Sequence, residues 1–312
     1  LFQNQGDGTF RSVASIKGVE AGRGLGVVAG DFDSDGRIDL FVANDMTANH
    51  LYWNETGTDQ EISFVEMGLG SGVAFDRDGR SQACMGIAAG DLTGNGKFDL
   101  LVTNFSLESN TLYSAQSARF FSDRTMPSGL KDASIPMLGF GAQMLDADLD
   151  GWLDLVVTNG HIDQGPGIEF AMAPQLFRNR DGHGFDELEA AAIGEYFRGR
   201  YLGRALIRWD YNRDGKPDFA VSHLDAPLAV LENTTQTSNR FLSLELKDAS
   251  RHDVTGAKII VEIGDRRLYR LVTAGDGYMA SNDRRIVCGL GSAETADKIV
   301  VLWRDGSRQE WS

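Results

Sequence analysis

The feature that most restricts how this chain can fold is an acidic pattern, D-x-[DNT]-x-[DN]-G-x-x-D, that occurs four times. The copies begin at Asp31, Asp91, Asp146 and Asp210, so their starts are separated by 60, 55 and 64 residues. Each copy runs directly into a short apolar segment, DLFVAN, DLLVTN, DLVVTN or DFAVSH, which is typical of a strand and not of an amphipathic helix. A recurrence at this spacing predicts a repeat architecture.

The oxygen atoms of this pattern have the spacing that a calcium loop needs. Ca²⁺ takes roughly six to eight oxygen ligands, and side chains at alternate loop positions 1, 3 and 5 can turn inward together. The glycine at position 6 suits a sharp turn with positive φ. An EF-hand has a bidentate glutamate at position 12, whereas all four copies here have valine, so the aspartate at position 9 is expected to be the last side-chain ligand.

The pattern therefore predicts calcium loops between two strands. The predicted side-chain ligands are Asp31, Asp33, Asp35, Asp39, Asp91, Thr93, Asn95, Asp99, Asp146, Asp148, Asp150, Asp154, Asp210, Asn212, Asp214 and Asp218. Position 7 is expected to offer a backbone carbonyl, from Arg37, Lys97, Trp152 and Lys216.

A metal-free hairpin turn is the alternative interpretation, because Asp-Gly is a common turn dipeptide. A turn does not need oxygen side chains at positions 1, 3, 5 and 9, yet all four copies have them. We therefore expect up to four Ca²⁺ ions. Affinity rises with ligand charge, and the second loop presents only two carboxylates, Asp91 and Asp99, so it is expected to lose its ion first.

The net charge of −15 has its main source in these loops. The successive loops hold 4, 2, 4 and 3 aspartates at the ligand positions, and four Ca²⁺ ions would bring the charge to −7. No basic patch opposes phosphate, so nucleic acid is not an expected partner.

The sequence contains no apolar run of 18 residues, so no membrane span is predicted. Cys84 and Cys288 lie 204 residues apart and are expected to be buried free thiols.

Each repeat can be divided into four strands, which predicts the blades of a β-propeller. The first strand, as in GLGVVAGDF, is rich in glycine and suits close packing near a central axis. The opening LFQNQGDGTF aligns with LFRNRDGHGF at 176–185, so it is expected to be half of a blade whose predecessors are missing. We predict an all-β chain with four blades and a half blade of a larger, seven-bladed ring; a closed four-bladed ring is the alternative.

The pattern changes after about Thr237. SNRFLSLELKD, GAKIIVEIG, RRLYRLVTAG, RRIVCGLG and DKIVVLWRDG alternate apolar and polar residues between turn residues. This alternation predicts a small antiparallel β domain. We expect propeller blades over 1–237 and the second domain over 238–312.

The repeats resemble FG-GAP/VCBS-type blades, through G-x-G-V-x-A-G-D-x-D-x-D-G-x-x-D-L and LYxN-x-G-D-G-x-F. The C-terminal stretch resembles the ASPIC/UnbV domain through NRFLSLEL, Gly275-Asp276-Gly277-Tyr278, CGLG at 288–291 and VLWRDG at 301–306. Together they resemble the cartilage acidic protein group and its bacterial relatives. The resemblance implies a secreted, extracellular or periplasmic, calcium-bound binding or scaffolding protein with a protein or glycan ligand. Thr93 and Pro217 depart from the pattern.

The sequence contains no pattern of a nucleophile with a neighbouring base, so we do not expect an enzyme. His161, in TNGHIDQGPGIEF, is expected to be a turn histidine bonded to backbone, with a ligand role as the alternative. His223 occupies the place of Asn44, Asn104 and Asn159 in the other blades, which favours a shared structural hydrogen bond. The alternative function is a polysaccharide-active enzyme or accessory subunit, which would need a cleft with paired acidic residues outside the four loops.

Overall fold

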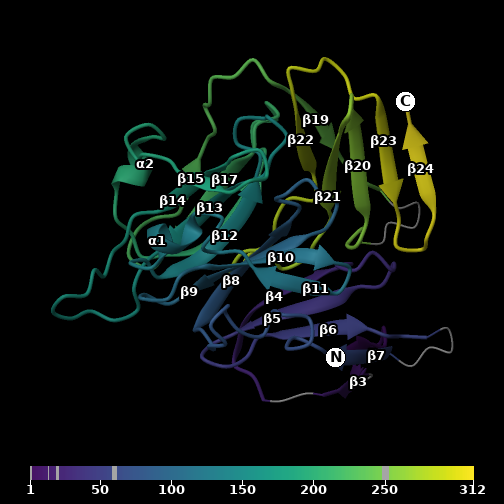
Figure 1. The fold of residues 1–312 in the computed structure, drawn as a ribbon, viewed down its shortest axis with the longest axis horizontal. Helices are drawn as coiled ribbons and strands as arrows, with labels where there is room; N and C mark the ends of the chain where they lie inside the picture. The colour runs from purple at the N-terminus through teal and green to yellow at the C-terminus, as the bar shows by residue number, and fades with distance from the viewer. Residues whose placement is uncertain (1, 13, 19–20, 58–61, 248–252) are drawn as a thin grey trace.

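The computed structural model describes residues 2–12, 14–18, 21–57, 62–247 and 253–312, and its regular secondary structure consists almost entirely of β-strands (Figure 1). The all-β fold expected from the sequence is confirmed. Strand pairs are antiparallel, except that β3 (Ala14–Lys17) pairs in parallel with β7 (Ile62–Glu66). Two short helices that the sequence patterns did not predict lie in connections between blades: α1 (Leu130–Ser134) and α2 (Glu195–Arg198).

Four blade-like sheets follow one another along the chain. The first contains β4 (Gly24–Gly30), β5 (Asp39–Asn44), β6 (His50–Asn54) and β7. The second contains β8 (Cys84–Gly90), β9 (Asp99–Asn104), β10 (Thr111–Ser117) and β11 (Phe120–Asp123). The third contains β12 (Gly139–Leu145), β13 (Asp154–Asn159), β14 (Gln175–Asn179) and β15 (Phe185–Glu187). The fourth contains β16 (Gly203–Trp209), β17 (Asp218–His223) and β18 (Ala229–Leu231).

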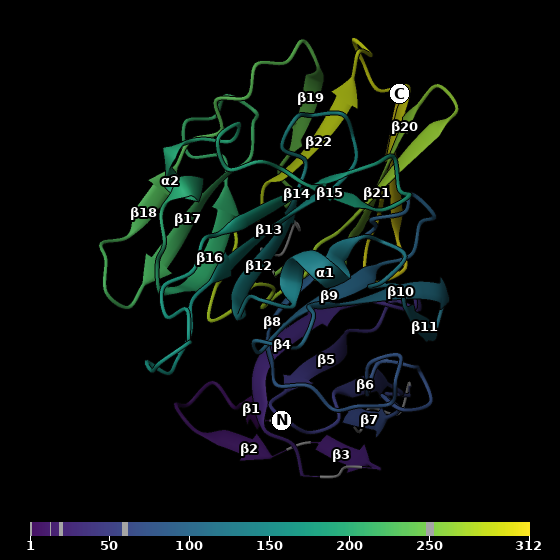
Figure 2. The ribbon, with the colours of Figure 1, turned by 60° about the vertical axis from the view of Figure 1, so that its left-hand side comes forward.

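The fourth blade differs from the expected four strands, because its sheet has three within the described residues. The opening segment forms a separate two-stranded sheet of β1 (Phe2–Asn4) and β2 (Phe10–Ser12), as expected for a half blade (Figure 2). The number of blades in a complete ring remains a prediction.

The glycine-rich first strands of the four blades pack side by side as the inner strands. A Cβ atom at Gly26 of β4 would collide with the carbonyl oxygen of Met85 in β8. A Cβ atom at Gly86 of β8 would collide with the carbonyl oxygen of Phe140 in β12. Only glycine permits this approach of one backbone to the next, so the inner role predicted for these strands is confirmed.

The C-terminal part forms two further sheets. One pairs β19 (Arg240–Leu244) with β22 (Ile286–Gly291), and the other has the order β21 (Arg266–Leu271), β20 (Lys258–Ile263), β23 (Lys298–Leu302), β24 (Arg308–Trp311). Strand β24 was not among the strands expected from the sequence. These sheets share a core that includes Ile259, Val261 and Val301. The expected strand at 238–248 ends at Asp248, which lies outside the described residues.

A segment of the C-terminal part, residues 274–283, lies against the inner strands of the blades. Ala29 of β4 and Ala274 exchange two backbone hydrogen bonds of 2.8 and 2.9 Å. The Ile87 N–H of β8 donates to the Gly277 carbonyl at 3.1 Å, and the Arg208 N–H of β16 donates to Asn282 Oδ1 at 3.0 Å. The C-terminal sheets are thereby held over the end of the blades where the acidic loops lie.

Candidate metal centre

The four acidic loops connect the first strand of each blade to the second, and they share one backbone conformation. The position-6 glycines have φ values of 86° at Gly36, 78° at Gly96, 98° at Gly151 and 84° at Gly215. The positive φ expected at this position is confirmed. Position 4 also has positive φ, at Ser34 (63°), Gly94 (69°), Leu149 (63°) and Arg213 (61°). The sequence did not indicate this second constraint, because only one of the four residues is glycine.

Two aspartates hold each loop to its blade. The position-1 carboxylate accepts the N–H of the position-6 glycine: Gly36 to Asp31 at 3.0 Å, Gly96 to Asp91 at 2.9 Å, Gly151 to Asp146 at 3.0 Å and Gly215 to Asp210 at 3.0 Å. The position-9 carboxylate accepts an N–H from the chain at or just after the third strand: Asn54 to Asp39, Ala115 to Asp99, Asn179 to Asp154 and Asn233 to Asp218. The loop acids therefore tie three strands of a blade together.

The remaining predicted residues also lie within the turns. The position-7 N–H donates to the position-5 side chain: Arg37 to Asp35 at 2.9 Å, Lys97 to Asn95 at 2.8 Å, Trp152 to Asp150 at 2.8 Å and Lys216 to Asp214 at 2.9 Å. At position 3, Asp33, Asp148 and Asn212 each accept the N–H of the position-5 residue. The ligand roles of the side chains and of the position-7 carbonyls remain predictions.

Burial makes the charged form of these carboxylates unfavourable. Desolvation raises the pKa of Asp39 to about 8 and that of Asp99 to about 7. The same cause raises the pKa of Asp31 and of Asp146 to about 6, and that of Asp154 well above its ordinary value. A divalent cation at these carboxylates would offset the cost of burying their charge.

The loops differ in how many carboxylates they bring together. In the first loop, oxygens of Asp31, Asp33 and Asp39 lie within 4.8 Å of one another. In the third, oxygens of Asp146, Asp148 and Asp150 do the same. Among the described residues, the second and fourth loops form no such group of three acidic side chains.

Two unpartnered oxygens show that the loops fit an oxygen-liganded cation. Asp146 Oδ1 and Thr93 Oγ1 are buried and make no hydrogen bond. Buried polar atoms in proteins are nearly always bonded, and carboxylate and hydroxyl oxygens suit Ca²⁺. The two carboxylate clusters offer oxygen ligands to a metal ion, and the unpartnered Asp146 Oδ1 belongs to the second of them.

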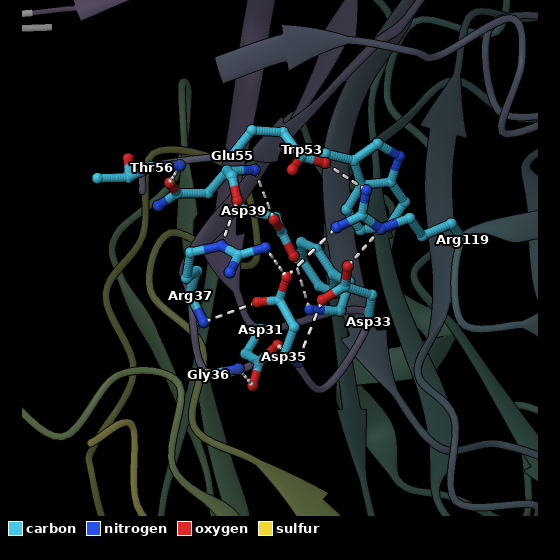
Figure 3. Close-up of polar contacts among 12 residues, drawn as sticks. Asp31, Asp33, Asp35, Gly36, Arg37, Asp39, Trp53, Glu55, Thr56 and Arg119 are labelled. Atoms are coloured by element: carbon cyan, nitrogen blue, oxygen red, sulfur yellow. Dashed lines mark hydrogen bonds and ion pairs between the residues drawn. The ribbon is translucent and has the colours of Figure 1, made fainter. Parts of the chain in front are cut away.

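Basic side chains from other parts of the chain approach three of the loops. Arg119, in the turn between β10 and β11, places Nε 2.6 Å from Asp33 Oδ2 and Nη2 3.3 Å from Asp35 Oδ2, and also contacts Glu55 (Figure 3). Arg270 Nη2 lies 3.8 Å from Asp146 Oδ2, and Lys258 Nζ donates to the Gly96 carbonyl at 2.7 Å. No local pattern in the sequence signals these three residues.

Two histidines, His161 and His223, and both cysteines have structural surroundings. His161 Nδ1 accepts the Asp163 N–H at 2.9 Å, and its Nε2 lies 3.2 Å from Ser106 Oγ, so the turn interpretation is confirmed. The shared role at the ends of the second strands is also confirmed, because Asn44, Asn104, Asn159 and His223 each bond a backbone carbonyl further along the same connection. Cys84 and Cys288 are buried and free, as expected.

Within the part of the chain that the structure describes, no helix is long and apolar enough to cross a membrane.

Comparison with known proteins supports the two resemblances seen in the sequence. Residues 1–42 and 31–102 match the FG-GAP-like repeat, and residues 247–312 match the ASPIC and UnbV family. Cartilage acidic protein 1 of Mus musculus is 27% identical over 309 residues, covering 95% of this chain and 44% of that protein. The Homo sapiens protein is 26% identical over 308 residues, covering 95% and 43%. The Xenopus tropicalis protein is 28% identical over 316 residues, covering 98% and 38%. The chain spans about two fifths of the length of these relatives.

Proposed function

We propose that this chain, which carries FG-GAP-like repeats followed by an ASPIC and UnbV domain, is an extracellular calcium-binding scaffold that binds a protein or glycan ligand. The observation that carries the proposal is the third loop, where three carboxylates converge within 4.8 Å and Asp146 keeps a buried oxygen without a partner. Converging charges of one sign repel unless a cation lies among them. Extracellular calcium modules work at about 10⁻⁴–10⁻³ M, so sites of modest affinity would be filled outside the cell.

In this proposal the ion strengthens the frame that the loop acids already form. The carboxylates at positions 1 and 9 bond the turn and the third strand of each blade. When the ion is bound, it supplies the positive charge that keeps these buried groups ionised in place. The blades would then present their remaining surfaces to a ligand on a rigid support.

Isothermal titration calorimetry of the chelator-treated chain tests the calcium proposal. We expect heat from Ca²⁺ binding and a rise in the melting temperature, with a smaller response to Mg²⁺, which demands stricter octahedral geometry. Asp31→Asn should remove calcium binding by the first loop, and Asp146→Asn should remove it from the third loop. Asp78→Asn, at an exposed aspartate outside the four loops, is the matched control. A chain that neither binds Ca²⁺ nor gains stability from it would rule the proposal out.

The alternative enzymatic function can be judged from a cleft that carries acidic side chains outside the four loops. A cavity of about 180 Å³ outside the four loops is lined by Asp76, Glu108 and Asp123, among others. Each of these carboxylates accepts a backbone N–H at 2.8 Å: Asp76 from Arg80, Glu108 from Ala83 and Asp123 from Arg77. Groups that hold backbone in this way are poorly placed to exchange protons with a substrate, so we propose that the chain is not an enzyme. Polysaccharide cleavage that Glu108→Gln abolishes would favour the alternative.

A further inference from the structure

The C-terminal part covers the backbone of the third acidic loop. Four successive carbonyl oxygens of this loop accept hydrogen bonds from it: Asp148 from Asn239 at 2.9 Å, Leu149 from Gly291 at 3.0 Å, Asp150 from Arg266 at 3.0 Å and Gly151 from Arg270 at 3.1 Å. In the described residues the second loop receives one such bond, from Lys258, and the first and fourth receive none. The third loop is therefore the main polar contact between the loops and the C-terminal sheets.

Strand β22 approaches this loop more closely than any side chain would allow. The Gly289 N–H donates to Asp146 Oδ2 at 2.9 Å. A Cβ atom at Gly289 would collide with the backbone of Leu149 and with this same carboxylate oxygen. The C-terminal part thus bonds both the backbone of the loop and its first predicted ligand.

The interior of the same loop holds the features of a cation site. Asp146 is 2% exposed, and its Oδ1 has no hydrogen-bond partner. Oxygens of Asp148 and Asp150 lie within 4.8 Å of that carboxylate. Donors from the C-terminal part therefore bond the loop carbonyls while the carboxylates converge on one another.

We propose that the third loop is an interdomain cation site, in which calcium held by Asp146, Asp148 and Asp150 and docking of β22 favour each other. This inference rests on the proposed function, because it needs the loop to bind calcium. Without the ion, Arg270 Nη2, which lies 3.8 Å from Asp146 Oδ2, offsets only part of the repulsion among the three carboxylates. The turn then opens, which moves the four carbonyls away from their donors. By linkage, docking must strengthen calcium binding by the same factor by which calcium strengthens docking.

Calcium is expected to control the β22 contact and not the attachment of the whole C-terminal part. Residues 274–283 bond the inner strands through Ala29, Ile87 and Arg208, at sites outside the loop turns. These bonds do not involve the loop carboxylates. Loss of the ion should therefore loosen β22 and free the Arg266 and Arg270 side chains of β21 from the loop. The segment 274–283 should meanwhile keep the C-terminal sheets in place.

Hydrogen exchange of the full chain with and without Ca²⁺ tests the first half of the coupling. We expect amides of Ile286–Gly291 to exchange about ten-fold more slowly with Ca²⁺, within the usual range of coupling between sites. Amides of β23 (Lys298–Leu302) should change much less. Asp31→Asn, which alters the first loop alone, should leave the calcium effect on β22 intact, whereas Asp148→Asn should remove most of it.

Calcium affinity in a docking variant tests the reciprocal half. Terbium luminescence sensitised by Trp152, which lies in the third loop, reports this site, and Trp152→Phe identifies its share of the signal. Gly289→Ala should weaken Ca²⁺ competition at this loop by about ten-fold, while Gly57→Ala, which meets no atom within 4 Å, should not change it. If Gly289→Ala does not fold, Asn239→Ala removes only the bond to the Asp148 carbonyl and should shift affinity less, in the same direction.

The outcomes separate this inference from the proposed function. If Ca²⁺ binds the third loop, Asp146→Asn abolishes that binding, and β22 exchange is the same with and without the ion, the coupling is wrong and the calcium-binding function stands. If the chain binds no Ca²⁺ at all, both are wrong. Slower β22 exchange together with weaker binding in the docking variant supports the coupling.

Discussion

Arg119 Nε lies 2.6 Å from Asp33 Oδ2, although the two residues are 86 positions apart and belong to neighbouring blades. The guanidinium also lies 5.2 Å from the centre of the Trp53 ring and contacts Glu55 (Figure 3). Asp33 is the position-3 residue of the first loop, and its side chain is 3% exposed. One blade therefore supplies a positive charge to the acidic loop of the blade before it.

Replacing Arg119 should have opposite effects on the stability of the ion-free chain and on the calcium affinity of the first loop. Arg119→Gln removes the charge that offsets Asp33 in the ion-free loop, so the ion-free chain should lose stability. The same change removes repulsion against a bound cation, so Ca²⁺ affinity of the first loop should rise about 1.5- to 5-fold, equivalent to the ~0.2–1 kcal/mol of partly exposed ion pairs. Calorimetric titration measures this shift. Arg124→Gln, at an arginine without an ion pair in the described residues, is the control; equal affinities in both variants would contradict the prediction.

The ion-free chain should become less stable as pH rises from about 5 to 8. Burial raises the pKa of Asp39 to about 8 and that of Asp31 to about 6, above the ~3.9 of an unfolded aspartate. Stability from these groups is complete below the unfolded pKa and is lost as pH rises through the folded pKa, because the folded chain must then bury a charge. Melting temperatures of chelated and Ca²⁺-loaded chain at pH 5, 6.5 and 8 should diverge with pH. A constant gap between the two curves would show that the loop carboxylates do not bind the ion.

Inner-strand glycines should be intolerant of even a methyl group. Gly86→Ala places Cβ against the Phe140 carbonyl of the next blade, and backbone cannot move aside as a side-chain tip can. We expect a loss of about 1–3 kcal/mol or more in the free energy of unfolding, as for overpacked cores. Urea denaturation measures it, with Gly57→Ala as the control. A loss below about 0.5 kcal/mol would mean that the blades separate easily.

The parts of the site predicted from the sequence are those determined within one repeat. Asp31 and Gly36 are five residues apart, and the same nine positions that contain the oxygens also form the turn, so four copies were enough to identify it. Gly26 and Gly86 marked the inner strands because close backbone approach excludes other residues. In both cases the physical requirement acts on neighbouring residues and leaves a local pattern.

The parts that were missed depend on contacts between repeats or between domains. Arg119, Lys258 and Arg270 reach loops more than fifty residues away, and where they point follows from how blades and sheets pack. Positive φ at Ser34 and Leu149 was missed because the loop imposes it on residues that do not prefer it. The three-stranded sheet of the last blade, within the described residues, and the parallel strand β3 were missed for a related reason, because strand pairing depends on segments that are distant in the sequence.

The second loop should bind calcium most weakly, and the structure adds a reason to the low number of carboxylates. Its carboxylates are Asp91 and Asp99 only, and Lys258 Nζ donates to the Gly96 carbonyl at 2.7 Å, which brings a positive charge to the loop. Asp146→Ala should therefore remove more calcium-binding free energy than Asp91→Ala in a calorimetric titration.

Lys258→Met provides the matched test of this reason, because it removes the charge and keeps most of the side-chain length. If the ammonium group limits the second loop, this variant should raise its Ca²⁺ affinity and leave the third loop, which Lys258 does not bond, unchanged. Total stability need not follow the same order, since the four carboxylates of a richer loop also repel one another when the ion is absent. Equal losses from Asp91→Ala and Asp146→Ala, or a greater loss from Asp91→Ala, would show that loop charge does not set the order of affinity.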